Sequence, residues 1–209
     1  MATTTGTYYS HAPDGTAQKV ETLKSGDTLM TRDHGAVAIR WVGKRKLGAD
    51  ELSQNPKLTP IIIKAGALGD AMPNHDLPNH DLMVSPQHNM LIKSPIAKRM
   101  FGEDEVLIPA QSLLDLDGVI RANISEVTYY HILFDAHEII EVNGAPSESL
   151  YSDLALMQSQ DHAQIDEMLE LFPEVRDIGT KPKPARLLTK TSTGAVLVKR
   201  HMLANQALI

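Results

Sequence analysis

Residues 80–92, His-Asp-Leu-Met-Val-Ser-Pro-Gln-His-Asn-Met-Leu-Ile, contain two short apolar runs separated by a polar turn sequence. Apolar runs bounded by turn residues are typical of β-strands. Pro86 has no backbone N–H to give to a ladder, so we predict that the chain bends there between two strands. The bend presents the hydroxyl of Ser85 and the imidazole of His88, three residues apart.

A hydroxyl and an imidazole at this spacing can act together on a peptide bond. A positioned imidazole can protonate a departing peptide nitrogen, which contributes about 10²–10⁴ in rate. The Ser85 hydroxyl can hold the scissile amide through a hydrogen bond. A Ser-x-x-His sequence alone, however, more often marks a turn serine and a buried structural histidine, so the rest of the chain must decide.

The composition excludes several classes of protein. The chain has 209 residues, which is enough for one large domain or a domain with an appendage. Its net charge is −6. Its one short basic run, Lys44-Arg45-Lys46, resembles a solvated strand end, so we expect no nucleic-acid binding. Without cysteine there is no disulfide, no Cys-ligated zinc and no thiol nucleophile.

The sequence also has no secretory signal at its N-terminus and no apolar stretch of about 18 residues. We therefore expect a soluble protein without a membrane span, either cytoplasmic or exported by a route that needs no signal peptide. Short β-prone runs follow one another with turn signals every eight to twelve residues, which predicts an all-β core. The strongest of these runs is 127–134, and Asn143-Gly144 predicts a two-residue turn.

Three separated motifs resemble the conserved blocks of Hint domains, the family of hedgehog autoprocessing domains, inteins and bacterial intein-like domains. Residues 81–91 resemble the second block, which reads Thr-x-x-His, with Ser85 in the Thr place. The first block is similar to the ordered series Gly6-Thr7, Pro13-Asp14-Gly15, Val20-Glu21-Thr22-Leu23, Ser25-Gly26-Asp27 and Arg40-Trp41-Val42-Gly43.

The last Hint block is similar to residues 130–144, Tyr-His-Ile-Leu-Phe-Asp-Ala-His-Glu-Ile-Ile-Glu-Val-Asn-Gly. His131 falls where many inteins carry Asp, and His137 falls on the histidine of this block. Either histidine alone would more often be structural. Three motifs in the correct order are a stronger indication than any one of them.

The resemblance implies a fold and a domain organisation. Residues 1–151 are expected to form a mostly-β, horseshoe-shaped Hint domain of two pseudo-symmetric halves. Residues 152–209 would be a small C-terminal α/β appendage. Within it, the apolar pattern predicts a helix at 161–171 with Asp161 as N-cap. The residues around Thr191-Ser192-Thr193-Gly194 predict a β-hairpin, although a helix from 195 onward is also compatible.

The resemblance further implies a single-turnover reaction that needs no cofactor. A Cys or Ser at the start of the domain attacks the preceding carbonyl, and the upstream polypeptide is the intramolecular substrate. Water or an external thiol then accepts the acyl group. His88 would protonate the leaving nitrogen, Ser85 would orient the scissile amide, and His131 would serve as the second-step base or as an orienter.

This chain departs from the family pattern at the nucleophile. Counting back from Gly6-Thr7 places the nucleophile position on Ala2, or on Thr3 if the extra residue before Pro13 is not an insertion. Alanine has no heteroatom, so the chemistry should be off in this chain. Asn143 precedes Gly144 and the chain continues, so cleavage or acyl transfer is expected rather than splicing.

Two other functions remain open at this point. One is a non-catalytic β-module for protein–protein interaction, with residues 152–209 as the contact surface. The other is a metal-binding module, because the exact repeat Pro-Asn-His-Asp-Leu at 73–77 and 78–82 supplies His75 and His80. A duplicated loop segment is the simpler explanation of that repeat, since Pro-Asn is loop chemistry.

Overall fold

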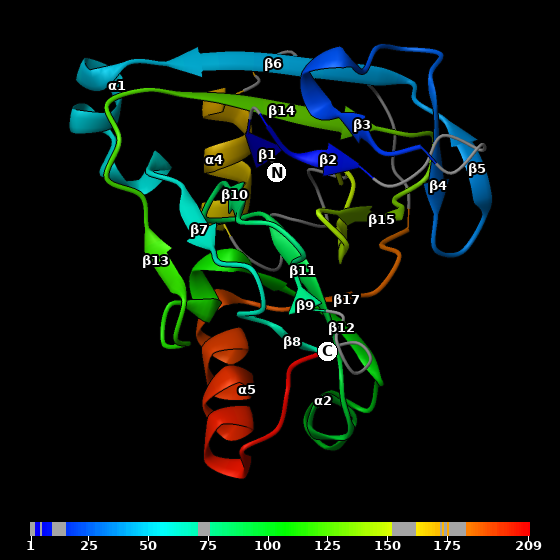
Figure 1. The fold of residues 1–209 in the computed structure, drawn as a ribbon, viewed down its shortest axis with the longest axis vertical. Helices are drawn as coiled ribbons and strands as arrows, with labels where there is room; N and C mark the ends of the chain where they lie inside the picture. The colour runs from blue at the N-terminus through cyan, green and yellow to red at the C-terminus, as the bar shows by residue number, and fades with distance from the viewer. Residues whose placement is uncertain are drawn as a thin grey trace.

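The computed structural model describes residues 3–4, 6–9, 16–70, 76–151, 162–171, 173, 175 and 183–209. Ala2, His75 and the predicted turn at 13–15 lie outside the described residues. The described part of the chain is mostly β, with two larger sheets and a few helices, so the predicted mostly-β class is confirmed. Figure 1 shows the long strands β6 and β14 along one end of the molecule and α5 at the other.

The first sheet is built around β14, the β-branched and aromatic stretch singled out in the sequence. Its strands lie in the order β13 (Val119–Arg121), β7 (Ile61–Ile63), β10 (Leu82–Val84), β1 (Thr3–Thr4), β14 (Val127–Leu133) and β6 (Trp41–Leu47). β14 pairs with β6 along its whole length, from Val127 opposite Leu47 to Leu133 opposite Trp41. The short β1 fills the gap between β10 and β14 and is antiparallel to both.

The second sheet contains the strand that follows the predicted bend. Its order is β17 (Leu187–Leu188), β12 (Glu105–Pro109), β11 (Asn89–Lys93), β16 (Ala145–Glu148), β15 (Ile139–Val142), β2 (Tyr8–Tyr9) and β3 (Gln18–Lys19). Two further strands, β4 (Thr28–Thr31) and β5 (Gly35–Ala38), extend it from β15, and β8 (Gly69–Asp70) pairs with β9 (Asp76–Leu77) separately. The chain therefore crosses from the first sheet to the second between β10 and β11.

Four helices cover these sheets in the described residues: α1 (Ala49–Gln54), α2 (Pro95–Phe101), α4 (His162–Leu171) and α5 (Thr191–Ala204). Single 3-10 turns lie at Val20–Thr22, Pro56–Leu58 and Ala110–Leu113. α4 occupies the segment where the sequence predicts a helix, and its Met168 and Leu171 are buried in a core cluster with Tyr129 of β14. In Figure 1 it lies behind β14.

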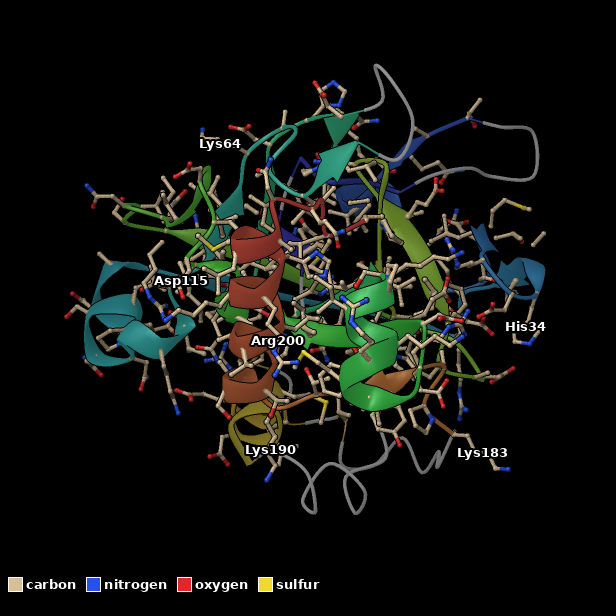
Figure 2. All side chains as sticks on the ribbon, turned by 90° about the horizontal axis from the view of Figure 1, so that it is seen from below. His34, Lys64, Asp115, Lys183, Lys190 and Arg200 are labelled. Carbon is tan, nitrogen blue, oxygen red and sulfur yellow. The ribbon has the colours of Figure 1, made fainter. Side chains whose placement is uncertain are left out.

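The hairpin predicted near the C-terminus is wrong. β17 is followed by α5, whose buried residues Gly194, Leu197, Val198 and His201 recur at helical spacing. Gly194, interpreted from the sequence as a turn residue, instead lets the helix approach the 3-10 turn at Ala110–Leu113, since a Cβ there would stand 2.7 Å from Ser112 Oγ. Arg200 lies on the exposed side of this helix, and Lys190 is the residue before its first turn (Figure 2).

Candidate functional site

The strand β1 marks the place where the predicted site residues meet. Thr3 pairs with Val84 of β10 on one side and with Tyr130 of β14 on the other. The residues that follow Val84 and Tyr130 are Ser85 and His131, which therefore flank the same end of β1. Thr3, Ser85 and His131 are all buried, with 0%, 0% and 1% of their surface exposed.

The bend predicted at Pro86 is a tight turn. The His88 N–H donates to the Ser85 carbonyl at 3.0 Å, which closes the turn with Pro86 as its first central residue. The turn is fixed from outside as well, because Gln111 N–H donates to the Pro86 carbonyl at 3.0 Å. Ser85 and His88 are thus held in a rigid, buried loop between β10 and β11.

The imidazole of His88 is enclosed by protein and carries no positive charge at neutral pH. Its Nε2 lies 3.0 Å from the Ser147 hydroxyl of β16, and Nδ1 has no hydrogen-bond partner among the described residues. Burial lowers the pKa of His88 from its ordinary value of 6.5 to about 3. A neutral imidazole with one uncommitted nitrogen can accept a proton and return it.

His131 lies on β14, opposite Gly43 of β6. Burial lowers its pKa well below 6.5, and its proximity to His88 adds to this effect. His131 is therefore also neutral at physiological pH. The structure brings His131 of β14 close to the turn that carries Ser85 and His88, which lies more than 40 residues earlier in the sequence.

His137 does not join this group. Its Nδ1 accepts a hydrogen bond from the Ala185 N–H at 3.1 Å, so Nε2 carries the proton in the neutral ring. Nε2 faces Glu148 Oε2 at 3.4 Å, and the ring packs on Tyr151 with centroids 4.9 Å apart. Glu148 in turn accepts a hydrogen bond from the Asn89 N–H at 2.9 Å. Its carboxylate therefore lies between His137 and Asn89, the residue that follows His88.

Glu167 of α4, which no sequence motif indicated, is 3% exposed and reaches the turn at Pro86. Its Oε2 accepts a hydrogen bond from Gln87 N–H at 3.2 Å, and the carboxyl also hydrogen-bonds to the Ser85 side chain. Burial raises the pKa of Glu167 from 4.5 to about 7, against these hydrogen bonds. One signal was available: Glu167 precedes Met168 and stands four residues before Leu171, on the apolar face of the helix.

No group of three His, Asp or Glu side chains that could hold a metal ion occurs in the described part of the chain. His80 is exposed, and its Nδ1 lies 2.9 Å from the Asn79 side-chain oxygen. Its repeat partner His75 and the nucleophile position Ala2 belong to the segments left undescribed. Among the helices of the described residues, none is long and apolar enough to cross a membrane.

Comparison with known proteins identifies one family. The profile of the Hint domain matches residues 5–154, which is most of the chain. No curated protein matches. Among solved structures, the chain is similar to the solution structure of a bacterial intein-like domain from Clostridium thermocellum. The TM-score is 0.44 and the identity 13%, over 72% of this chain and 98% of that one.

Proposed function

Since this chain belongs to the Hint-domain family, we propose that it is a self-processing domain built to cleave or exchange the peptide bond ahead of its own first strand. The observation that carries the proposal is the meeting of Ser85, His88 and His131 at one end of β1. An imidazole and a hydroxyl at this place are what an acyl shift at the start of the domain would use. They lie in a buried setting in which a hydrogen bond or a proton transfer acts without competition from water.

The proposed reaction begins with a Cys or Ser side chain at position 2, which attacks the carbonyl carbon of the preceding residue. The thiol or hydroxyl proton passes to the neutral imidazole of His88. The C–N bond then breaks, and His88 returns that proton to the leaving nitrogen, so that an ester or thioester replaces the peptide bond. Water or a thiol takes the acyl group in the second step, for which His131 is the base or the orienting group.

The low pKa of His88 supports this sequence of proton transfers. An imidazole already protonated at neutral pH could not accept the nucleophile's proton, whereas a neutral imidazole can. The imidazolium that then forms is a strong acid in this buried setting and gives its proton readily to the departing nitrogen. Because position 2 carries Ala2, which cannot attack, we propose that the chain with this residue is inactive.

The test restores the nucleophile. Ala2→Cys in the full chain, with a short peptide fused ahead of it, should release that peptide, and added thiol should accelerate the release. His88→Ala in the restored protein should slow release by about two orders of magnitude or more, the usual size of general acid–base catalysis. Mass spectrometry of the intact protein over time measures both.

Two controls accompany this experiment. The same fusion with Ala2 retained should stay intact, and His80→Ala in the restored protein should leave the rate unchanged, because His80 is exposed. If the restored protein remains uncleaved with thiol over several days, the self-processing proposal is wrong.

A second candidate is a non-catalytic module that binds another protein. Ala2 favours it, and so do the exposed apolar residues Val196, Met202 and Leu203 of α5, with 47%, 48% and 82% of their surface accessible. This candidate becomes the better one only if the restored protein fails to cleave.

A further inference from the structure

The helix α4 brings an acidic side chain into the site from outside the part of the chain that matches the family profile. The match ends at residue 154, and α4 begins at His162. Glu167 nonetheless bonds to both Gln87 N–H and the Ser85 side chain, and it is almost fully buried. A carboxyl group in contact with the hydroxyl that orients the scissile amide can control what that hydroxyl does.

The protonation state of Glu167 decides the direction in which the Ser85 hydroxyl donates its hydrogen bond. A serine hydroxyl has one proton to donate and lone pairs that accept. An ionised Glu167 can only accept, so Ser85 donates to it and turns lone pairs toward the peptide. A protonated Glu167 can donate to Ser85 Oγ, which frees the Ser85 proton to point at the peptide. Gln87 N–H finds an acceptor oxygen in either form.

We propose that Glu167 is a positioning residue that sets the direction of the Ser85 hydrogen bond in the self-processing reaction. Protonated Glu167 turns the Ser85 hydroxyl proton toward the carbonyl oxygen that becomes negative during attack. Ionised Glu167 turns it away. This inference rests on the proposed function and adds that the C-terminal extension completes the active site.

The surroundings of Glu167 make both forms accessible near neutral pH. Burial is the main cause of its raised pKa of about 7. The hydrogen bonds from Ser85 and Gln87, the α-amino charge of the chain and, least of all, the charge of Lys57 oppose this effect. Lys57 lies outside α4, and its amino group is paired with Glu170 of α4 at 3.0 Å. Tyr129 of β14 faces Glu167 as well, but its hydroxyl donates to the Leu58 carbonyl at 2.7 Å and stays neutral, since burial raises its pKa.

Glu167→Gln tests the inference in the Ala2→Cys chain with the fused peptide. The glutamine side chain is uncharged and carries N–H protons that can be donated to Ser85, so this variant stands in for the protonated acid at every pH. The Ala2→Cys chain and its Glu167→Gln variant have the same nucleophilic thiol. The effect of pH on thiol ionisation is therefore the same in both, and it drops out of the ratio of their rates. The ratio should be about 1 near pH 5.5. At about pH 8.5 the variant should be faster by up to ~30-fold, because a group with a pKa of about 7 is then only ~3% protonated. The fused peptide removes the terminal charge that lowers this pKa, so ~30-fold is the upper bound.

Glu170→Gln is the matched control, since it removes the same charge from the same helix without touching Ser85. It should keep the pH dependence of the parent, shifted only by the loss of the Lys57–Glu170 pair. In a Ser85→Ala background, Glu167→Gln should have no pH-dependent effect, because the hydroxyl through which it acts is gone. A Glu167→Gln variant that is slower at all pH values would overturn the inference. So would a rate ratio that persists without Ser85.

A measurement on the chain with Ala2 separates this inference from the proposed function. The Gln87 amide donates to Glu167, so its NMR shifts should titrate near pH 7, and Glu167→Gln should abolish that titration. If the amide does not titrate, the role of Glu167 is wrong even when peptide release succeeds. If it titrates but the restored protein never cleaves, the proposed function fails, and the processing role of Glu167 fails with it.

Discussion

His88 and His131 are buried imidazoles that the folded protein keeps uncharged. In the unfolded chain each has an ordinary pKa near 6.5, whereas in the folded protein burial holds both pKa values far lower. As pH falls below 6.5, the unfolded chain binds protons that the folded protein does not bind. Each residue therefore stabilises the fold less as the solution becomes acidic, and for His88 this loss extends down to about pH 3.

The residue-scale prediction concerns His88→Gln. The stability difference between the parent and this variant should change by about 1.4 kcal/mol per pH unit between pH 6 and pH 4, with the parent losing more. Urea unfolding at several pH values measures it. His80→Gln, which changes an exposed imidazole, should give a constant difference. A pH-independent difference for His88→Gln would mean that its imidazole is charged in the folded state.

At the scale of elements, α4 shows why part of the site escaped sequence reasoning. The turn from Ser85 to His88 is local, so its residues could be identified from a short motif and a proline. Glu167 bonds to Gln87 across 80 residues, and His88 bonds to Ser147 across 59. No local pattern contains such pairs. The hairpin prediction around Gly194 was wrong for a related reason. Glycine permits both a turn and a close helix contact, and the contact with Ser112, which is distant in sequence, distinguishes the two.

The element-scale prediction tests how firmly α4 is held. Met168 is 1% exposed, and it packs in the cluster of Tyr129 and Leu171. Met168→Ala should lower the free energy of unfolding by about 2–5 kcal/mol, the range for truncating a buried apolar side chain. Leu169→Ala on the same helix should cost less, since Leu169 is only partly buried. Equal losses in urea unfolding would contradict the described packing of α4.

At the scale of the whole molecule, the boundary that the sequence suggests at residue 151 does not divide the core. Both core clusters contain residues from beyond it: Met168, Leu171, Val175, Leu188, Leu197, Val198 and Leu208. Arg186 adds polar contacts across the same boundary, to Asp33 at 2.8 Å and to Glu105 at 2.7 Å. We propose that residues 152–209 are an integral part of the domain and not a separate appendage.

The corresponding prediction is that deleting residues 152–209 exposes apolar surface, lowers solubility and lowers the melting temperature by at least ten degrees or abolishes cooperative melting. The physical reason is that several fully buried side chains would leave the core at once, at about 2 kcal/mol or more each. Scanning calorimetry of the truncated and full chains decides it. An unchanged melting curve would show that the first 151 residues fold independently.

The position of β1 between β10 and β14 also has a consequence for the timing of protein synthesis. The first described strand has both of its neighbours only after β14 has emerged from the ribosome, and Glu167 follows later still. About 160 residues separate Thr3 from Glu167, which corresponds to roughly 10–30 s of translation at about 5–20 residues per second. A nascent chain with a restored nucleophile would therefore carry its upstream polypeptide intact through that interval. Release would be delayed until nearly the whole sequence has been made.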